Sequence, residues 1–261
     1  MEFVSSAVGA GKLRRTSRFI GGCGRAMLVA IDMQSAAGSG PAPDVVRQVE
    51  TGEPNGILVT WQIARRYPEA FAYCGLLLRV DGAGTLLGPS GRGDELSLMY
   101  RAEQAAVIGA DAVVVMAYPA MEGGAPSLQR LATLVGECER IGMPVVAESI
   151  PGGWRQEVPW DAEHIGRAAR ICVEIGADAI KTMAPSDPSD LSEVVENCEV
   201  PLFVLGGPKR ETEDEAVGYA RRVVEAGASG IVFGRNVWSA GDPTSMVRRL
   251  YEAVHGHPRI R

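Results

Sequence analysis

A lysine at the end of a short apolar segment is the residue in this sequence best placed to do chemistry. Lys181 follows Gly176-Ala-Asp-Ala-Ile and precedes Thr182. The glycine is typical of a helix end, and the apolar residues after it suit a strand buried on both faces. Burial disfavours the ammonium form, and a neutral lysine amine can attack a carbonyl to form a Schiff base. The alternative is a strand-end lysine whose ammonium reaches solvent.

Two acidic residues also stand where apolar segments end. Asp32 ends the segment 27–32, and Glu148 lies at the end of the segment 144–149. A carboxylate near the reactive lysine suits the proton transfers that accompany imine and enamine formation. Structural alternatives remain open for both acids. Asp32 could cap the next segment or pair with a lysine, and Glu148 could pair with a neighbouring arginine or lysine. The other polar residues at or just after the ends of the predicted strands are Arg79, Ser149, Thr182 and Lys209.

Two glycine-containing loops near the C-terminus indicate a phosphate site. Gly206-Gly207 follows one apolar segment, and Gly234-Arg235 follows the next. Glycines let backbone amides approach an anion closely, and a helix N-terminus adds positive potential. These loops follow the seventh and eighth predicted strands, where α/β barrels commonly bind phosphate. Two ordinary turns are the alternative.

The element pattern around these residues predicts a TIM (β/α)8 barrel. Eight short apolar segments alternate with helix-like stretches, and 261 residues is a usual length for such a barrel. An open sheet is the alternative. We expect one barrel domain at residues 27–261 and an N-terminal extension at residues 1–26 that covers the bottom of the barrel, with a solvated arm as the other interpretation. The predicted strands are 27–32, 56–60, 75–80, 110–116, 144–149, 177–182, 201–205 and 230–233.

The composition excludes several classes of protein. Hydrophobic residues make up 46% of the chain, enough for a sizeable core, and the net charge of −6 argues against nucleic acid as a partner. We expect no membrane span, because no apolar run approaches about 18 residues, and no secretory signal peptide. The three histidines lie far from any cysteine or carboxylate cluster, so neither a metal nor another cofactor is expected. Five scattered cysteines suggest free thiols in the cytoplasm.

Several of these motifs together resemble the DeoC/FbaB class I aldolase family. They are Gly-Lys-Leu-Arg-Arg from Gly11, the acid at Asp32, the segment 176–182, Gly-Gly-Pro-Lys at 206–209 and Phe-Gly-Arg-Asn at 233–236. The resemblance runs from Gly11 to the final predicted helix. It implies a TIM barrel, a Schiff base on Lys181 and an acid/base role for Asp32. It also implies phosphate binding around Gly206, Gly207, Gly234 and Arg235, and assembly into pentamers or decamers.

The sequence departs from this family at two places. The family often has Asp-His-Gly after strand one, where this chain has Asp32-Met33-Gln34. Its fructose-bisphosphate members carry Ser-Tyr-Pro-Arg-Gly at the end of strand five, whereas this chain has Ser149-Ile150-Pro151. That tyrosine donates a proton in the family, so Ile150 requires either another group, for which Glu148 is the candidate, or a changed reaction.

The resulting expectation is a metal-independent, Schiff-base aldolase that makes or breaks a carbon–carbon bond in a phosphorylated keto-sugar. Its substrate would resemble dihydroxyacetone phosphate, with Lys181, Asp32 and Glu148 as the catalytic residues. The alternatives are a thiolase- or isomerase-type enzyme acting on a phosphorylated sugar, and a phosphosugar-binding protein without catalysis. The aldehyde partner and the physiological direction do not follow from the sequence.

Overall fold

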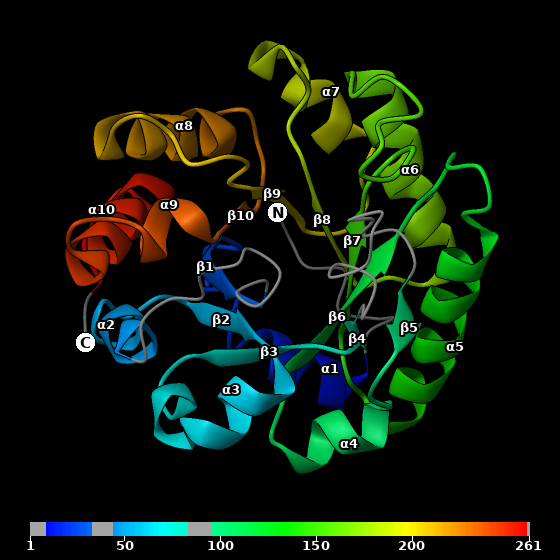
Figure 1. The fold of residues 1–261 in the computed structure, drawn as a ribbon, viewed down its shortest axis with the longest axis horizontal. Helices are drawn as coiled ribbons and strands as arrows, with labels where there is room; N and C mark the ends of the chain where they lie inside the picture. The colour runs from blue at the N-terminus through cyan, green and yellow to red at the C-terminus, as the bar shows by residue number, and fades with distance from the viewer. Residues whose placement is uncertain (1–8, 33–43, 83–95, 260–261) are drawn as a thin grey trace, which may run out of the picture.

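The structure is a computed structural model that describes residues 9–32, 44–82 and 96–259. Eight parallel strands close into a barrel in the order β1-β10-β9-β8-β7-β6-β3-β2, and helices surround it (Figure 1). The predicted TIM barrel is therefore confirmed, and the open sheet is wrong. The barrel strands are β1 (Ala26–Ile31), β2 (Gly56–Val59), β3 (Gly75–Arg79), β6 (Ala112–Ala117), β7 (Val145–Ser149), β8 (Ala179–Thr182), β9 (Leu202–Leu205) and β10 (Gly230–Phe233).

The helices follow the apolar stripes and capping signals of the sequence. Asp161 caps α6 by accepting a hydrogen bond from the His164 amide, and Asp242 caps α10 in the same way. Gly142 and Gly176 end α5 and α6 in the left-handed conformation. The helices are α1 (Ala10–Thr16), α2 (Val45–Thr51), α3 (Trp61–Arg66), α4 (Ala102–Val107), α5 (Ala125–Ile141), α6 (Ala162–Ile175), α7 (Leu191–Glu196), α8 (Glu213–Glu225), α9 (Arg235–Trp238) and α10 (Pro243–His255), with 3₁₀ turns η1 (Pro68–Phe71) and η3 (Pro188–Asp190).

A short hairpin that the sequence did not predict follows β3. Its strands β4 (Asp81–Gly82) and β5 (Ser97–Leu98) pair antiparallel. Residues 83–95, which connect the two strands, lie outside the described part of the chain. Residues 33–43, which include Met33 and Gln34, lie outside it as well.

Strand alternation divides the apolar residues into two clusters. One set fills the interior of the barrel, and a larger set lies between the strands and the surrounding helices. Successive strand residues point to opposite faces, so a residue two positions beyond an interior apolar residue also points inward. Arg79, Glu148 and Lys181 each occupy such a position, after Leu77, Val146 and Ala179. Together these three polar residues form the uppermost layer of the barrel interior.

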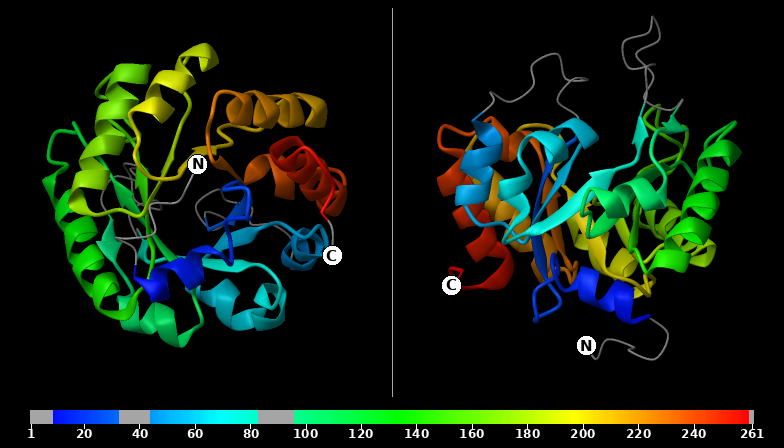
Figure 2. Two further views of the ribbon diagram at one scale, coloured as in Figure 1. Left: turned by 180° about the vertical axis from the view of Figure 1, so that it is seen from behind. Right: turned by 90° about the horizontal axis from the view of Figure 1, so that it is seen from below.

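The segment before β1 contacts the opposite end of the barrel. In the side view of Figure 2, α1 lies below the strands. Phe19 and Ile20 belong to the interior apolar cluster, and the Lys12 ammonium pairs with Asp178, just before β8, at 2.9 Å. The assignment of residues 1–26 as a cover for the barrel bottom stays a prediction, because residues 1–8 lie outside the described part of the chain.

Replacement of Phe19 by alanine should destabilise the barrel from below. Phe19 is 1% exposed, and truncation of a buried phenylalanine costs about 3–5 kcal/mol. Urea unfolding should show this loss in the free energy of unfolding. Leu13→Ala is the control, since Leu13 is 47% exposed and should change stability by less than about 0.5 kcal/mol. A loss below about 1 kcal/mol for Phe19→Ala would show that the segment does not close the barrel core.

Candidate active site

Lys181 forms a buried ion pair with Glu148 at the top of the barrel interior. The two residues are register partners on the neighbouring strands β8 and β7. Their side chains point to the same side of the sheet, and Lys181 Nζ lies 2.8 Å from Glu148 Oε1. Lys181 is 5% exposed and Glu148 is 3% exposed. The prediction that Lys181 is buried at a strand end is thus confirmed, and a solvent-reaching lysine is wrong.

Arg79 joins the two predicted carboxylates into one network. Its Nε and one terminal nitrogen donate to Asp32 Oδ2 at 2.9 and 2.7 Å. The same terminal nitrogen contacts Glu148, and the other nitrogen lies 3.3 Å from Asp81 Oδ1. Asp32, Glu148 and Lys181, which are far apart in sequence, therefore belong to one buried cluster of two basic and three acidic side chains. Asp81 is a member that sequence reasoning missed, although it directly follows the third strand.

The surroundings of these carboxylates move their pKa values in opposite directions. Burial alone would raise the pKa of Glu148, but the Lys181 ammonium and the Arg79 guanidinium outweigh burial and lower it to about 2. Burial raises the pKa of Asp81, and Arg79 and the Met116 amide only partly oppose this. Glu148 is therefore the firmly ionised carboxylate beside Lys181.

The lowered pKa of Glu148 predicts a specific acid sensitivity. An ionised Glu148 stabilises the folded state above its ordinary pKa of about 4.3, and this contribution disappears as pH falls towards its folded pKa. The difference in unfolding free energy between the wild type and Glu148→Gln should shrink by about 1 kcal/mol between pH 6 and pH 3.5. Urea unfolding at a series of pH values measures it. A difference that stays constant with pH would mean that Glu148 is not held ionised by its partners.

A cavity of about 990 Å³ opens above this network at the C-terminal ends of the strands. Asp32, Glu148 and Lys181 line it, and so do the predicted phosphate-binding residues Gly206, Gly207, Gly234 and Arg235. The structure therefore brings all the candidate site residues to one cavity. Lys209 is not among its lining residues, because its ammonium is exposed and donates to the Ser239 carbonyl oxygen at 2.9 Å.

The loops after β9 and β10 are held together where the phosphate site was predicted. Asn236 donates to the carbonyl oxygens of Gly206 and Pro208 at 3.2 and 3.1 Å, and Arg235 donates to that of Gly207 at 3.1 Å. Gly207 has a φ of +66°, which favours glycine. A Cβ on Gly234 would lie 3.1 Å from the Ala30 carbonyl oxygen. The backbone geometry of this corner therefore favours glycine at both positions.

Other residues of the cavity were missed by sequence reasoning. Arg210 lines the cavity beside the glycine loops, and its guanidinium lies 3.8 Å above the Tyr219 ring centroid. The aromatic side chains that line the cavity are Trp61, Tyr100, Trp154, Trp160, Tyr219 and Trp238. Ile150, which stands where the family's tyrosine is expected, is fully buried in the cluster between strands and helices. It is not among the lining residues of the cavity.

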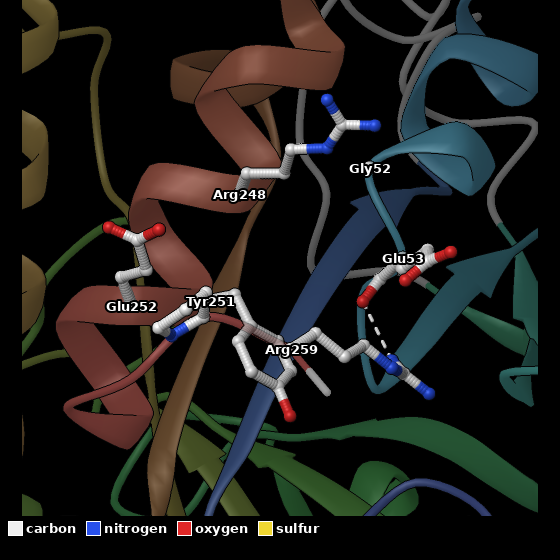
Figure 3. A pocket seen from close by; sticks show the side chains of 7 residues that line it. Gly52, Glu53, Arg248, Tyr251, Glu252 and Arg259 are labelled. Atoms are coloured by element: carbon white, nitrogen blue, oxygen red, sulfur yellow. Dashed lines mark hydrogen bonds between the residues drawn. The ribbon is translucent and has the colours of Figure 1, made fainter. Parts of the chain in front are cut away.

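A second, smaller cavity of about 110 Å³ lies beside the C-terminal half of α10 (Figure 3). Arg259 crosses it and donates to the carbonyl oxygens of Glu53 and Pro54 at 2.7 and 2.6 Å. These bonds hold the C-terminal segment against the turn before β2, at the end of the barrel away from Lys181. We therefore place the candidate site in the larger cavity.

The described residues contain neither a membrane-crossing helix nor a metal-binding cluster. None of their helices is long and apolar enough to cross a membrane. No group of three or more histidine, cysteine, aspartate or glutamate side chains among them is arranged to hold a metal ion.

Comparison with known proteins identifies the family. The sequence profile of the DeoC/LacD family aldolases matches residues 26–240. The chain belongs to the DeoC/LacD aldolase family. This membership confirms the resemblance found in the motifs, and it covers all eight strands of the barrel.

Individual members of the aldolase family align with most of the chain. The class 1 fructose-bisphosphate aldolase of Thermoproteus tenax is 32% identical over 208 residues, which cover 79% of this chain and 77% of that protein. The 2-amino-3,7-dideoxy-D-threo-hept-6-ulosonate synthase 1 of Archaeoglobus fulgidus is 28% identical over 249 residues. This alignment covers 95% of this chain and 92% of that protein.

A solved structure matches this aldolase fold closely. It is an archaeal fructose-1,6-bisphosphate aldolase whose catalytic lysine is covalently bound to the carbinolamine intermediate of the substrate. The TM-score is 0.82 at 28% identity, and the match covers 93% of this chain and 99% of that one. The family fold and the closed barrel described above therefore agree.

Proposed function

We propose that this protein is a Schiff-base aldolase that makes or breaks a carbon–carbon bond in a phosphorylated keto-sugar with a donor part like dihydroxyacetone phosphate. The observation that carries the proposal is the buried pair of Lys181 and Glu148 on the floor of a cavity that also contains the glycine loops. Membership of the aldolase family supports it. That membership favours neither a thiolase- or isomerase-type enzyme nor a non-catalytic phosphosugar-binding protein.

In the proposed mechanism, Lys181 attacks the substrate ketone. Glu148 accepts a proton from the Lys181 ammonium across their 2.8 Å contact, which frees the amine lone pair for attack. The attacking nitrogen passes one proton to the new alkoxide, which gives the carbinolamine, and the protonated carboxyl then donates its proton to the hydroxyl, which leaves as water. The resulting iminium withdraws electrons, so the adjacent carbon–carbon bond can break or form through an enamine. Glu148 takes the place of the tyrosine that Ile150 replaces.

We assign Asp32 to proton transfer at the reacting carbons and Arg79 to positioning. Arg79 holds Asp32 through two hydrogen bonds and also contacts Glu148. One guanidinium therefore fixes the distance between the two carboxylates. Fixed geometry of this kind lowers the entropy cost of each proton transfer.

The substrate phosphate is assigned to Gly206, Gly207, Gly234 and Arg235. Hydrogen bonds from Asn236 hold the first of these loops in place, so the backbone is ordered before substrate binds. Arg210 adds a positive charge to the same side of the cavity. Binding of the phosphate in these loops, away from the reacting carbon, would help position the substrate carbonyl over Lys181.

The proposed activity predicts carbon–carbon bond formation without added metal. Purified protein should join dihydroxyacetone phosphate to an aldehyde, and activity should persist in excess EDTA, since the imine itself is the electron sink. Product mass and NMR detect the new carbon–carbon bond. Loss of activity in EDTA that returns with a divalent metal would contradict the Schiff-base assignment. Conversion of the phosphate substrate into an isomer of equal mass would indicate an isomerase.

Two further assignments accompany the proposed function. We propose a homo-oligomer, a pentamer or decamer by family resemblance, which native mass spectrometry would test. We also propose that the protein works in the cytoplasm. All five cysteines are free thiols, which supports a reducing compartment.

A further inference from the structure

The cavity has two chemically different halves. The loops after β9 and β10 form the phosphate half, and in the circular strand order these strands stand opposite β3 and β6 (Figure 1). Six aromatic residues of the described chain line the cavity. Tyr219 and Trp238 lie on α8 and α9 in the phosphate half, and the other four lie in the segments that follow β2, β5 and β7. We call Trp61, Tyr100, Trp154 and Trp160 the aromatic wall. A substrate whose phosphate lies in the first half and whose ketone lies over Lys181 would extend its remaining carbons towards this wall.

The aromatic wall is built from two ring pairs. The rings of Trp61 and Tyr100 stack with centroids 4.5 Å apart and an interplanar angle of 11°. Trp154 and Trp160 meet edge to face at 6.4 Å. The Trp160 indole N–H already donates to the Pro151 carbonyl oxygen at 3.0 Å. Paired rings present rigid apolar faces, which suit a flat or branched apolar group.

Charge also distinguishes the two halves. Among the described residues that line the cavity, the basic side chains are Arg79, Lys181, Arg210 and Arg235. Arg79 is held by three carboxylates, and Lys181 is the proposed nucleophile. Arg210 and Arg235 both lie in the phosphate half. Among the described lining residues, therefore, no basic side chain outside the buried network lies beside the aromatic wall, where a second phosphate would need one.

From these observations, and resting on the proposed function, we infer that the acceptor is an apolar aldehyde carrying an aromatic or branched hydrocarbon group. A cavity of about 990 Å³ is at the upper end of the range for small-molecule sites, which leaves room for such a group beside the donor. In the synthetic direction, the enamine carbon of the Lys181-bound donor bonds to the aldehyde carbon, and the aldehyde oxygen takes a proton. Water then hydrolyses the iminium and frees Lys181.

The test uses enzyme whose phosphate half is already filled. Borohydride reduction with dihydroxyacetone phosphate should leave the donor fixed on Lys181 as a secondary amine. Calorimetry then compares benzyl alcohol, an analogue of an aromatic aldehyde that cannot react, with glycerol 3-phosphate. We expect benzyl alcohol to bind at least about tenfold more tightly than glycerol 3-phosphate. An apolar pocket discriminates by roughly this factor between ligands that differ in how well they fill it.

Variants locate the binding on the aromatic wall. Trp61→Leu should weaken benzyl alcohol binding by about fivefold or more, and Trp154→Leu is a second variant at a 39% exposed position. Tyr73→Leu is the control, because Tyr73 is 85% exposed and is not a lining residue of the cavity. Equal or tighter binding of glycerol 3-phosphate, no binding of either compound, or unchanged binding in both tryptophan variants would overturn the inference. Failure to form any adduct on Lys181 would instead overturn the proposed function on which it rests.

Discussion

Lys181→Ala should lower turnover by at least about 10⁴-fold, because removal of a covalent nucleophile leaves only binding and general electrostatics. Neither of the other two lysines can take its place, because Lys12 bonds to Asp178 and Lys209 bonds to the Ser239 carbonyl oxygen. Steady-state assay of aldol formation measures the loss. Binding of inorganic phosphate should change little, since the glycine loops are left intact.

Lys209→Ala is the matched control for this variant. The chain has only three lysines, and Lys209 is exposed, with its ammonium on the Ser239 carbonyl oxygen rather than in the cavity. Its replacement should leave turnover within about twofold of the wild type. Substantial turnover in Lys181→Ala would contradict the Schiff-base role, and an equal loss in both variants would indicate a general effect of lysine replacement.

Glu148→Gln should lower kcat by about 10²–10⁴-fold, the range for loss of a positioned acid/base group. Glutamine keeps the shape but cannot accept the proton of the Lys181 ammonium. KM for the phosphorylated donor should change little, because the glycine loops belong to other strands. The ratio of kcat to KM effects, measured at saturating aldehyde, separates a chemical role from a binding role.

Glu137→Gln is the corresponding control. Glu137 is also buried, but it accepts from the Ala102 amide on the outer side of the barrel. Its replacement tests the cost of removing a buried carboxylate without touching the site. We expect Glu137→Gln to keep the kcat of the wild type. If Glu148→Gln also kept the full kcat, the proton-transfer role of Glu148 would be wrong.

The strands and the position of Lys181 could be predicted from the sequence because their signals are local. Gly176 ends α6, and the short strand β8 that comes next contains Lys181 as its third residue. The carboxyl ends of barrel strands meet at one face, so Asp32, Glu148 and the glycine loops could be placed near Lys181 without knowing any contact.

The network around Arg79 could not be predicted in the same way. Arg79 bonds to Asp32 and to Glu148, which are 47 and 69 positions away. Side-chain partners at such separations depend on barrel register and rotamers rather than on neighbouring residues. The short helix α1 and the β4–β5 hairpin were also missed, because elements this short carry little periodicity.

The aromatic wall was missed for a different reason. Trp61 and Tyr100 are 39 positions apart, and neither one marks a strand or a helix end by itself. Only the closed barrel brings the loops after β2 and β3 together so that the two rings stack. Searching every loop that follows a strand for aromatic residues, as well as for charged ones, would have found them.

The most direct test of the central claim is borohydride reduction in the presence of dihydroxyacetone phosphate, followed by peptide mass mapping. The proposed mechanism predicts one stable adduct on Lys181, none on Lys12 or Lys209, and loss of activity in proportion to labelling. The absence of an adduct on Lys181, under conditions in which the protein converts the same ketone, would contradict Schiff-base catalysis.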